Sequence, residues 1–187
     1  MNLPRILVVD DEEQIRLSYR TILATEEPGS SLEDRASALF AQEETSPADE
    51  WDELLGEDEG VVISEEEGLE TENYDIAEAS HGQEAVDLVK KALAEGIPYS
   101  LAFMDVRMPP GIDGVEAAKR IRQLDPNIEI VIMTAYSDYN WDEIVEKVGN
   151  PDRLLYFHKP FQPEQIRQLA SSLTQHWYLE KKRREQD

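Results

Sequence analysis

The sequence RILVVDDEE, residues 5–13, is a nearly continuous apolar run that ends in four consecutive acids. A run without polar alternation is typical of a parallel strand that is covered on both faces. The residues that follow place apolar side chains at helical spacing, namely Ile15, Tyr19, Ile22 and Leu23. The pattern therefore predicts a buried strand over residues 5–9 and a helix over residues 13–24.

The rest of the chain repeats this alternation of strand and helix. Further strands are predicted at residues 74–79, 101–105, 128–133 and 154–158. Helices are predicted after a capping-box pattern at Ser80-x-x-Gln83, after the Pro/Gly loop 108–114, at residues 141–148 and from Pro163 onward. Five strand–helix units predict an α/β fold, (βα)5, with a doubly wound, five-stranded parallel sheet and right-handed crossovers.

Most of the negative charge lies in one segment. The chain has 41 acidic and 18 basic residues, a net charge of -23, and residues 26–73 alone carry 18 acids and one base, Arg35. Their Glu, Asp, Ser, Gly and Pro content favours a solvated stretch over a second core, with short helices predicted at residues 31–42 and 46–56. We interpret residues 26–73 as an acidic insertion between the first helix and the second strand, most simply a spacer.

Composition excludes several classes of function. The chain has no Cys, and its three His, at positions 81, 158 and 176, lack the spacing of zinc ligands, so thiol redox and zinc chemistry are excluded. Neither a membrane-spanning run nor a signal peptide is evident, and we expect a cytoplasmic protein without a membrane partner. Because so acidic a surface repels a phosphate backbone, we expect no direct contact with nucleic acid.

Polar residues follow the predicted strands at their carboxyl ends, where open parallel sheets bind ligands. These residues are Asp10, Asp11, Asp105, Thr134 and Lys159. Each alone has an ordinary role, such as a helix cap, but five at one sheet edge indicate a site. Crowded carboxylates raise one another's pKa unless a cation lies between them. A hard divalent ion with oxygen ligands, such as Mg²⁺, fits this requirement.

The motifs at this edge resemble those of the receiver domains of bacterial two-component response regulators. The matching stretches are VVDDE (8–12), MDVRMP (104–109), DG (113–114), MTA (133–135) and KPF (159–161). They stand in the family's order and at its spacing once residues 26–73 are set aside. The resemblance implies a flavodoxin-like strand order, 2-1-3-4-5. It divides the chain into a receiver domain over residues 1–175, interrupted by the insertion, and a charged helical extension or linker over residues 176–187.

The resemblance also implies roles for individual residues. Asp105 would be the phosphoacceptor, a carboxylate nucleophile that takes a phosphoryl group from a sensor histidine kinase or a phosphotransfer protein. Mg²⁺ would be bound at Asp10, Asp11, Asp105 and the backbone carbonyl of Arg107. A domain of this kind promotes its own phosphorylation and dephosphorylation, and it is a signalling domain rather than a turnover enzyme.

Switching would follow from the same phosphoryl group. Thr134 and Lys159 would bind phosphoryl oxygens, and Tyr156 would rotate inward behind Thr134. The movement would switch a surface made of the helix at 141–148, the strand at 154–158 and the last helix, and so control an output partner or domain. The family further implies a cis peptide bond before Pro160.

Three features depart from the family pattern. The loop 108–114 is one residue longer than the common form, which could shift the following helix relative to the site. Arg107 and Tyr136 are bulky residues that flank the phosphoryl pocket and leave the lifetime of the phosphorylated form open. The third departure is the acidic insertion, for which the family offers no general role.

The sequence leaves the output and two alternative functions open. An output domain beyond residue 187 and a homodimer through the last helix, anchored by Trp177 and Tyr178, both fit its charged end. An interaction protein that docks its insertion on a basic partner is a second function, which uptake of phosphate or beryllofluoride with Mg²⁺ would separate from a receiver. A flavin protein fits poorly, because the loop after the first strand is acidic where a phosphate cradle needs amides.

Overall fold

A single parallel sheet organises the chain. The computed structural model describes residues 3–24, 73–135 and 139–186. Their strands are β1 (Arg5–Val9), β2 (Asp75–Ala79), β3 (Leu101–Asp105), β4 (Glu129–Thr134) and β5 (Leu154–His158). The strand order is β2-β1-β3-β4-β5, and every neighbouring pair is parallel. The predicted fold class and strand order are confirmed, with β2 and β4 each beginning one residue later than predicted.

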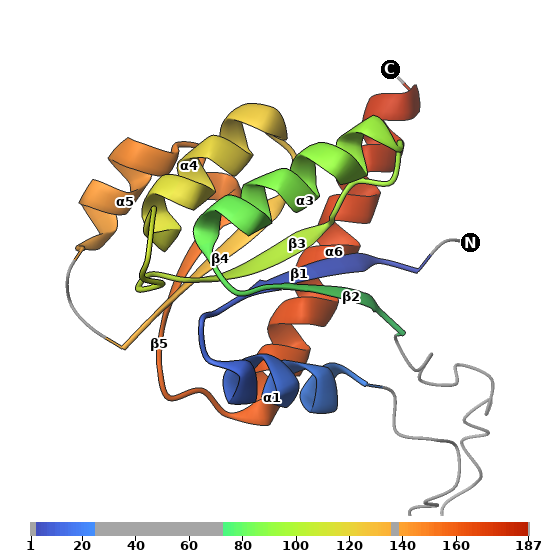
Figure 1. Cartoon of the computed structure of the whole chain (residues 1–187). Helices are drawn as coiled ribbons and strands as arrows, with labels where there is room; N and C mark the ends of the chain where they lie inside the picture. Colours follow the sequence, from blue (N-terminus) through green and yellow to red (C-terminus); the bar gives the residue numbers. More distant parts are fainter. Residues whose placement is uncertain (1–2, 25–72, 136–138, 187) are drawn as a thin grey trace, which may run out of the picture. The chain divides into compact units, whose positions relative to one another are not determined.

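Helices cover both faces of this sheet. They are α1 (Glu13–Leu23), α3 (Gly82–Ala94), α4 (Gly114–Leu124), α5 (Trp141–Val148) and α6 (Pro163–Gln186). Figure 1 shows α3, α4 and α5 on one face and α1 with α6 on the other. The two helices predicted at residues 31–42 and 46–56, and Tyr136, lie outside the described residues.

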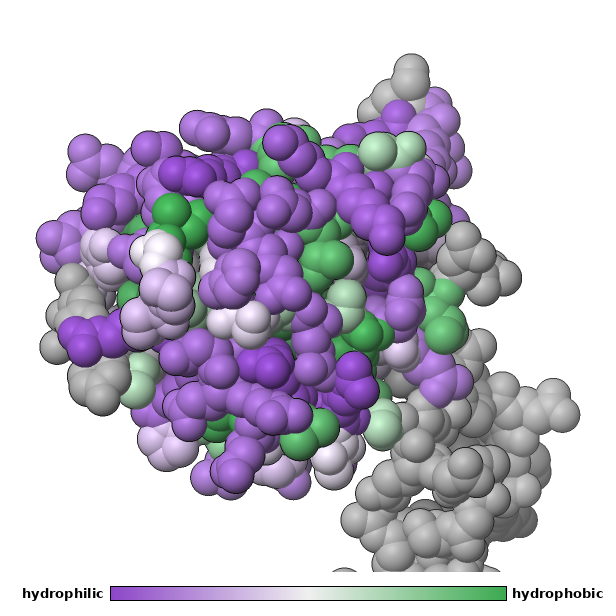
Figure 2. Space-filling view, in the orientation of Figure 1, coloured by the Kyte–Doolittle hydropathy of each residue, from purple (hydrophilic) through white to green (hydrophobic). Residues whose placement is uncertain are grey.

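Alternate residues of the central strands supply two apolar cores. In β3, Leu101 and Phe103 pack with α1 and α6, whereas Ala102 and Met104 pack with α3 and α4. Both faces of the strand are therefore buried, which explains its continuous apolar sequence. On the face seen in Figure 2 the surface is mostly hydrophilic, with apolar residues in small separate patches. In the described part of the chain, no helix combines the length and apolarity needed to cross a membrane.

The start of α3 corrects the predicted cap by one residue. His81, rather than Ser80, is the N-cap, because its Nδ1 accepts a hydrogen bond from the backbone N–H of Glu84 at 3.2 Å. The Glu84 carboxylate in turn accepts from the N–H of Ser80 at 2.7 Å and from its hydroxyl at 2.9 Å. Glu84 therefore bonds to the residue before the N-cap rather than to the N-cap itself, so only half of a capping box is formed at the start of α3.

Buried charges attach the C-terminal half of α6 to the sheet. Glu129, at the start of β4, is 1% exposed, and its Oε1 lies 2.6 Å from Arg153 Nη1 and 2.9 Å from His176 Nδ1. Glu180, one turn further along α6, accepts from Arg153 Nη2 at 3.5 Å and from Arg183 Nη2 at 2.8 Å. The helix continues without a break to Gln186, so the charged residues after Leu179 extend it beyond its apolar stripe.

Candidate functional site

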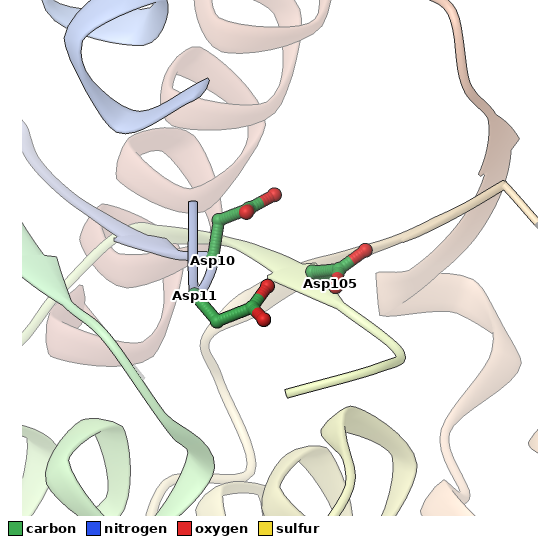
Figure 3. A group of neighbouring side chains, drawn as sticks. All are labelled: Asp10, Asp11 and Asp105. Atoms are coloured by element: carbon green, nitrogen blue, oxygen red, sulfur yellow. The ribbon is translucent and has the colours of Figure 1, made fainter. Parts of the chain in front are cut away.

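Three carboxylates meet at the carboxyl ends of β1 and β3. Asp10 and Asp11 directly follow β1, and Asp105 is the last residue of β3, the neighbouring strand. Each offers an oxygen within 4.8 Å of the others, and Figure 3 shows the three side chains side by side. Asp10 and Asp105 are buried, at 2% and 8% exposure, while Asp11 is exposed. The structure therefore brings together the three acids that the sequence placed at one edge.

Lys159 reaches this cluster from the end of β5. Its Nζ lies 2.6 Å from Asp10 Oδ2 and 2.9 Å from Asp105 Oδ1. Burial acts to lower the pKa of Lys159, but its hydrogen bonds to Asp10 and Asp105 outweigh burial and raise the pKa, so the ammonium stays charged. Burial raises the pKa of Asp105, and the negative charges of Asp10 and Asp11 act in the same direction.

The donor set of this cluster fits a hard divalent cation. One ammonium faces three carboxylates, which leaves the group with an excess of negative charge. Carboxylate oxygens from a rigid sheet edge are the ligands that Mg²⁺ prefers. The described cluster contains no nitrogen or sulfur ligand that would favour a softer metal.

Hydrogen bonds fix the direction of Asp10, the first of the two acids after β1. The backbone N–H of Glu12 donates to Asp10 Oδ1 at 2.9 Å, so the Asp10 side chain caps the turn that leads into α1. Arg16, on the first turns of α1, donates from Nη1 to the Asp10 carbonyl at 2.7 Å and lies 3.4 Å from Glu78 on β2. Asp10 is thus fixed through its side chain and its backbone.

The chain after Asp105 folds tightly back on its own strand. The N–H of Val106 donates to the Met133 carbonyl at 3.1 Å, and the N–H of Gly114 donates to the Val106 carbonyl at 2.9 Å. The loop between them carries Arg107, which is exposed, and a cis peptide bond between Pro109 and Pro110. The first turn of α4 therefore lies directly behind Asp105, despite the longer loop.

Thr134 lies at the same edge, at the end of β4, and Tyr156 lies two residues before the end of β5. Thr134 is the buried last residue of β4, one position beyond the residue that pairs with Asp105. Its carbonyl accepts a hydrogen bond from the N–H of Lys159 at 2.8 Å, and the Lys159–Pro160 peptide is cis. Tyr156 is half-buried, packs edge-on against His158, and donates from its hydroxyl to the Tyr139 carbonyl at 3.3 Å.

The structure adds one residue that sequence reasoning missed. Tyr139 precedes α5, and its hydroxyl donates to Asp113 Oδ2 at 2.7 Å, across two loops of the site. The Asn140-x-x-Glu143 capping box is a sequence signal for a helix start, and it would have placed Tyr139 directly before that helix. Nothing in the local pattern indicates its partner, which is 26 residues away.

Comparison with known proteins agrees with this fold. A family model described as the response regulator receiver domain matches residues 54–171. The chain therefore belongs to the response regulator receiver domain family, a family of phosphorelay signalling. Strand β1, with Asp10 and Asp11, precedes the matched residues but pairs with both β2 and β3 in the same sheet.

Individual relatives support the assignment. Sporulation initiation phosphotransferase F of Bacillus subtilis is 32% identical over 114 residues, which are 61% of this chain and 85% of that protein. The regulatory protein PhoP of the same organism is also 32% identical over 114 residues, 60% of this chain but 43% of PhoP. A CheY-like receiver domain structure from Methanospirillum hungatei has a TM-score of 0.58 at 19% identity, with 96% of this chain and 99% of that one covered, and shares the fold.

Proposed function

We propose that Asp105 is the phosphoacceptor of this receiver domain and takes its phosphoryl group from a histidine kinase or phosphotransfer protein. The observation that carries the proposal is the cluster in which Asp105 lies with Asp10, Asp11 and the Lys159 ammonium at one sheet edge. A carboxylate nucleophile needs little further machinery, because positioning and electrostatics account for most phosphoryl-transfer catalysis.

The three carboxylates would hold Mg²⁺, as receiver domains generally do at an acidic pocket. Asp11 and Asp105 are suited to direct ligation and Asp10 to orienting water on the ion, with the Arg107 carbonyl as a further ligand by family resemblance. When bound, Mg²⁺ would neutralise charge that develops on the phosphoryl oxygens. Lys159 provides a second positive charge at the same place, since its ammonium already contacts Asp105.

The switch would run through Thr134 and Tyr156. A phosphoryl group on Asp105 would attract the Thr134 hydroxyl from the adjacent strand β4, and Tyr156 on β5 would follow. The surface that changes is made of α5, β5 and α6, where Trp141 and Leu155 are exposed, at 40% and 39%. Its occupant would be an output domain beyond residue 187, a separate output protein or a second copy of the chain, in the cytoplasm.

Phosphoryl labelling tests the acceptor and the metal. We expect the protein to be labelled by acetyl phosphate in the presence of Mg²⁺, with a base-labile bond that is typical of an acyl phosphate. Asp105→Asn should abolish labelling, and Asp11→Ala should abolish its dependence on Mg²⁺. Asp152→Asn, at an exposed aspartate near the opposite end of β5, is the matched control and should be labelled like the wild type. Full labelling of the Asp105→Asn protein would refute the assignment.

A further inference from the structure

We propose that Tyr139 is a positioning residue that joins the loop after β3 to the loop after β4, so that the state of Asp105 is passed to α5. The proposal rests on the phosphoacceptor role of Asp105. We call the contact between the Tyr139 hydroxyl and the Asp113 carboxylate the Tyr139 bridge.

Both carboxylate oxygens of Asp113 accept hydrogen bonds. Oδ1 accepts from the backbone N–H of Glu116 at 2.8 Å and so caps α4, while Oδ2 accepts from the Tyr139 hydroxyl at 2.7 Å. The second bond is short and ends on an acidic side chain, as expected of a charge-assisted hydrogen bond. The start of α4 is thus tied to the loop that leads into α5.

Residues of β5 and α5 also contact Tyr139. Its backbone carbonyl accepts the hydroxyl of Tyr156 at 3.3 Å, and Lys147 Nζ lies 4.4 Å from the centre of its ring. The next residue, Asn140, caps α5 with a complete capping box. A displacement of Tyr139 therefore has to move the first turn of α5, the side of the switch surface that carries Trp141.

The other end of the bridge is fixed to Asp105. The N–H of Gly114, next to Asp113, donates to the Val106 carbonyl, and a Cβ on Gly114 would overlap the Asp105 carbonyl oxygen. The first turn of α4 therefore cannot shift independently of the Asp105 backbone. Through the bridge, a change at Asp105 has a route to α5 in addition to the one through Thr134 and Tyr156.

The test separates binding at Asp105 from the response at α5. Beryllofluoride with Mg²⁺ is used as the phosphoryl mimic, and its binding is measured by the ¹⁹F NMR signal of the bound fluorides. The response is the shift of the ¹⁵N-labelled indole signal of Trp141, which is the first residue of α5 and is 40% exposed. That signal is assigned with Trp141→Phe.

Two variants remove the bridge in different ways. Tyr139→Phe keeps the ring and the carbonyl that Tyr156 uses, and Asp113→Ser keeps a side chain able to cap α4 but loses the oxygen that Tyr139 uses. In both, we expect beryllofluoride affinity within about twofold of wild type and a Trp141 shift reduced by at least about half. Tyr178→Phe, at an exposed tyrosine on α6, is the matched control and should change neither.

The outcomes distinguish the bridge from the acceptor. A full Trp141 shift in both bridge variants, or no shift in the wild type on binding, would overturn the bridge and leave the acceptor role intact. A wild-type protein that binds no beryllofluoride, or an Asp105→Asn protein that binds it equally well, would overturn the acceptor role and the bridge with it.

Discussion

Gly114 lies directly against the backbone of Asp105, so closely that a Cβ added to Gly114 would stand 1.8 Å from the Asp105 carbonyl oxygen and 2.7 Å from its carbonyl carbon. Both atoms belong to the backbone, and no side-chain rotation can relieve the overlap. The Asp113-Gly114 pair of the motif therefore has a steric reason as well as a capping one. It allows the first turn of α4 to pack behind the proposed phosphoacceptor.

Gly114→Ala should impair both folding and phosphorylation. The added methyl group must push α4 away from Asp105, at a cost of about 3 kcal/mol, as for other overpacked cores. Urea unfolding and labelling by acetyl phosphate measure the two effects. Gly96→Ala is the control, because its Cβ would meet open space and only the positive φ of 72° is strained, for about 1 kcal/mol. Equal stability of the two variants would contradict the close approach.

Lys159→Met should strengthen Mg²⁺ binding while it slows phosphorylation. The Lys159 ammonium lies within 2.9 Å of oxygens of Asp10 and Asp105, so it competes for the charge that a cation would use. We expect about tenfold higher Mg²⁺ affinity, or ~1.4 kcal/mol, by calorimetry. Lys90→Met, at an exposed lysine on α3, should leave the affinity unchanged. Weaker Mg²⁺ binding in Lys159→Met would show that Lys159 supports the metal site rather than competing with it.

Glu129→Gln should change how stability depends on pH. Burial raises the pKa of Glu129 above its ordinary 4.5, although His176 and Arg153 oppose this effect. A folded protein with a raised carboxyl pKa holds that proton more tightly than the unfolded chain. Its stability therefore falls, relative to the Gln variant, as pH rises from about 4.5 to the pKa of the folded protein. The loss is about 1.4 kcal/mol for each pH unit that separates the folded and unfolded pKa values.

The measurement is urea unfolding of both proteins at several pH values. The difference in unfolding free energy between wild type and Glu129→Gln isolates the titration of this carboxyl. Gln123→Asn, at an exposed glutamine on α4, changes no titrating group; it is the control and should give a difference that is flat across the same range. A difference that moves in favour of the wild type as pH rises would show that the folded protein lowers this pKa instead.

Removal of residues 28–71 should leave a folded receiver domain. The residues on either side of that range form a five-stranded sheet with helices on both faces. The deletion leaves a short connection between Ala24 and Tyr74, within the usual length for a helix-to-strand loop. Circular dichroism and phosphoryl labelling test the expectation that residues 26–73 are an insertion. Loss of either property would show that the segment is part of the domain.

Hydrophobic patterning was sufficient to predict the five strands, whereas their order in the sheet came from the family resemblance. β3 and β4 are buried at every position, and such strands have continuous apolar sequences that differ clearly from the helices between them. The convergence of Asp10, Asp105 and Lys159 was predictable for a related reason. Parallel strands bring their carboxyl ends to one edge of the sheet. The residues that follow these strands therefore lie close together, however far apart they are in the sequence.

Contacts between distant side chains were not predictable. Glu129 is an acid at the start of a strand, a position that is usually solvated, and its partner His176 is 47 residues away. The Tyr139 bridge depends in the same way on how two loops approach each other. Local spacing carries information about caps and faces, and even there the α3 cap lies at His81 rather than Ser80, because His81 Nδ1 accepts from the backbone N–H of Glu84.

The buried anchor of α6 has a mechanical consequence. Because Glu129 holds His176 and Arg153 holds Glu180, the helix is fixed to the sheet close to its far end as well as along its apolar stripe. These contacts fix both the direction of the α6 axis and the rotation of the helix about that axis. A segment that continued this helix would start in a defined direction, and each residue inserted at the junction would turn that segment by about 100° and advance it by about 1.5 Å. The number of residues in such a junction would therefore determine the orientation of the following segment relative to the receiver domain.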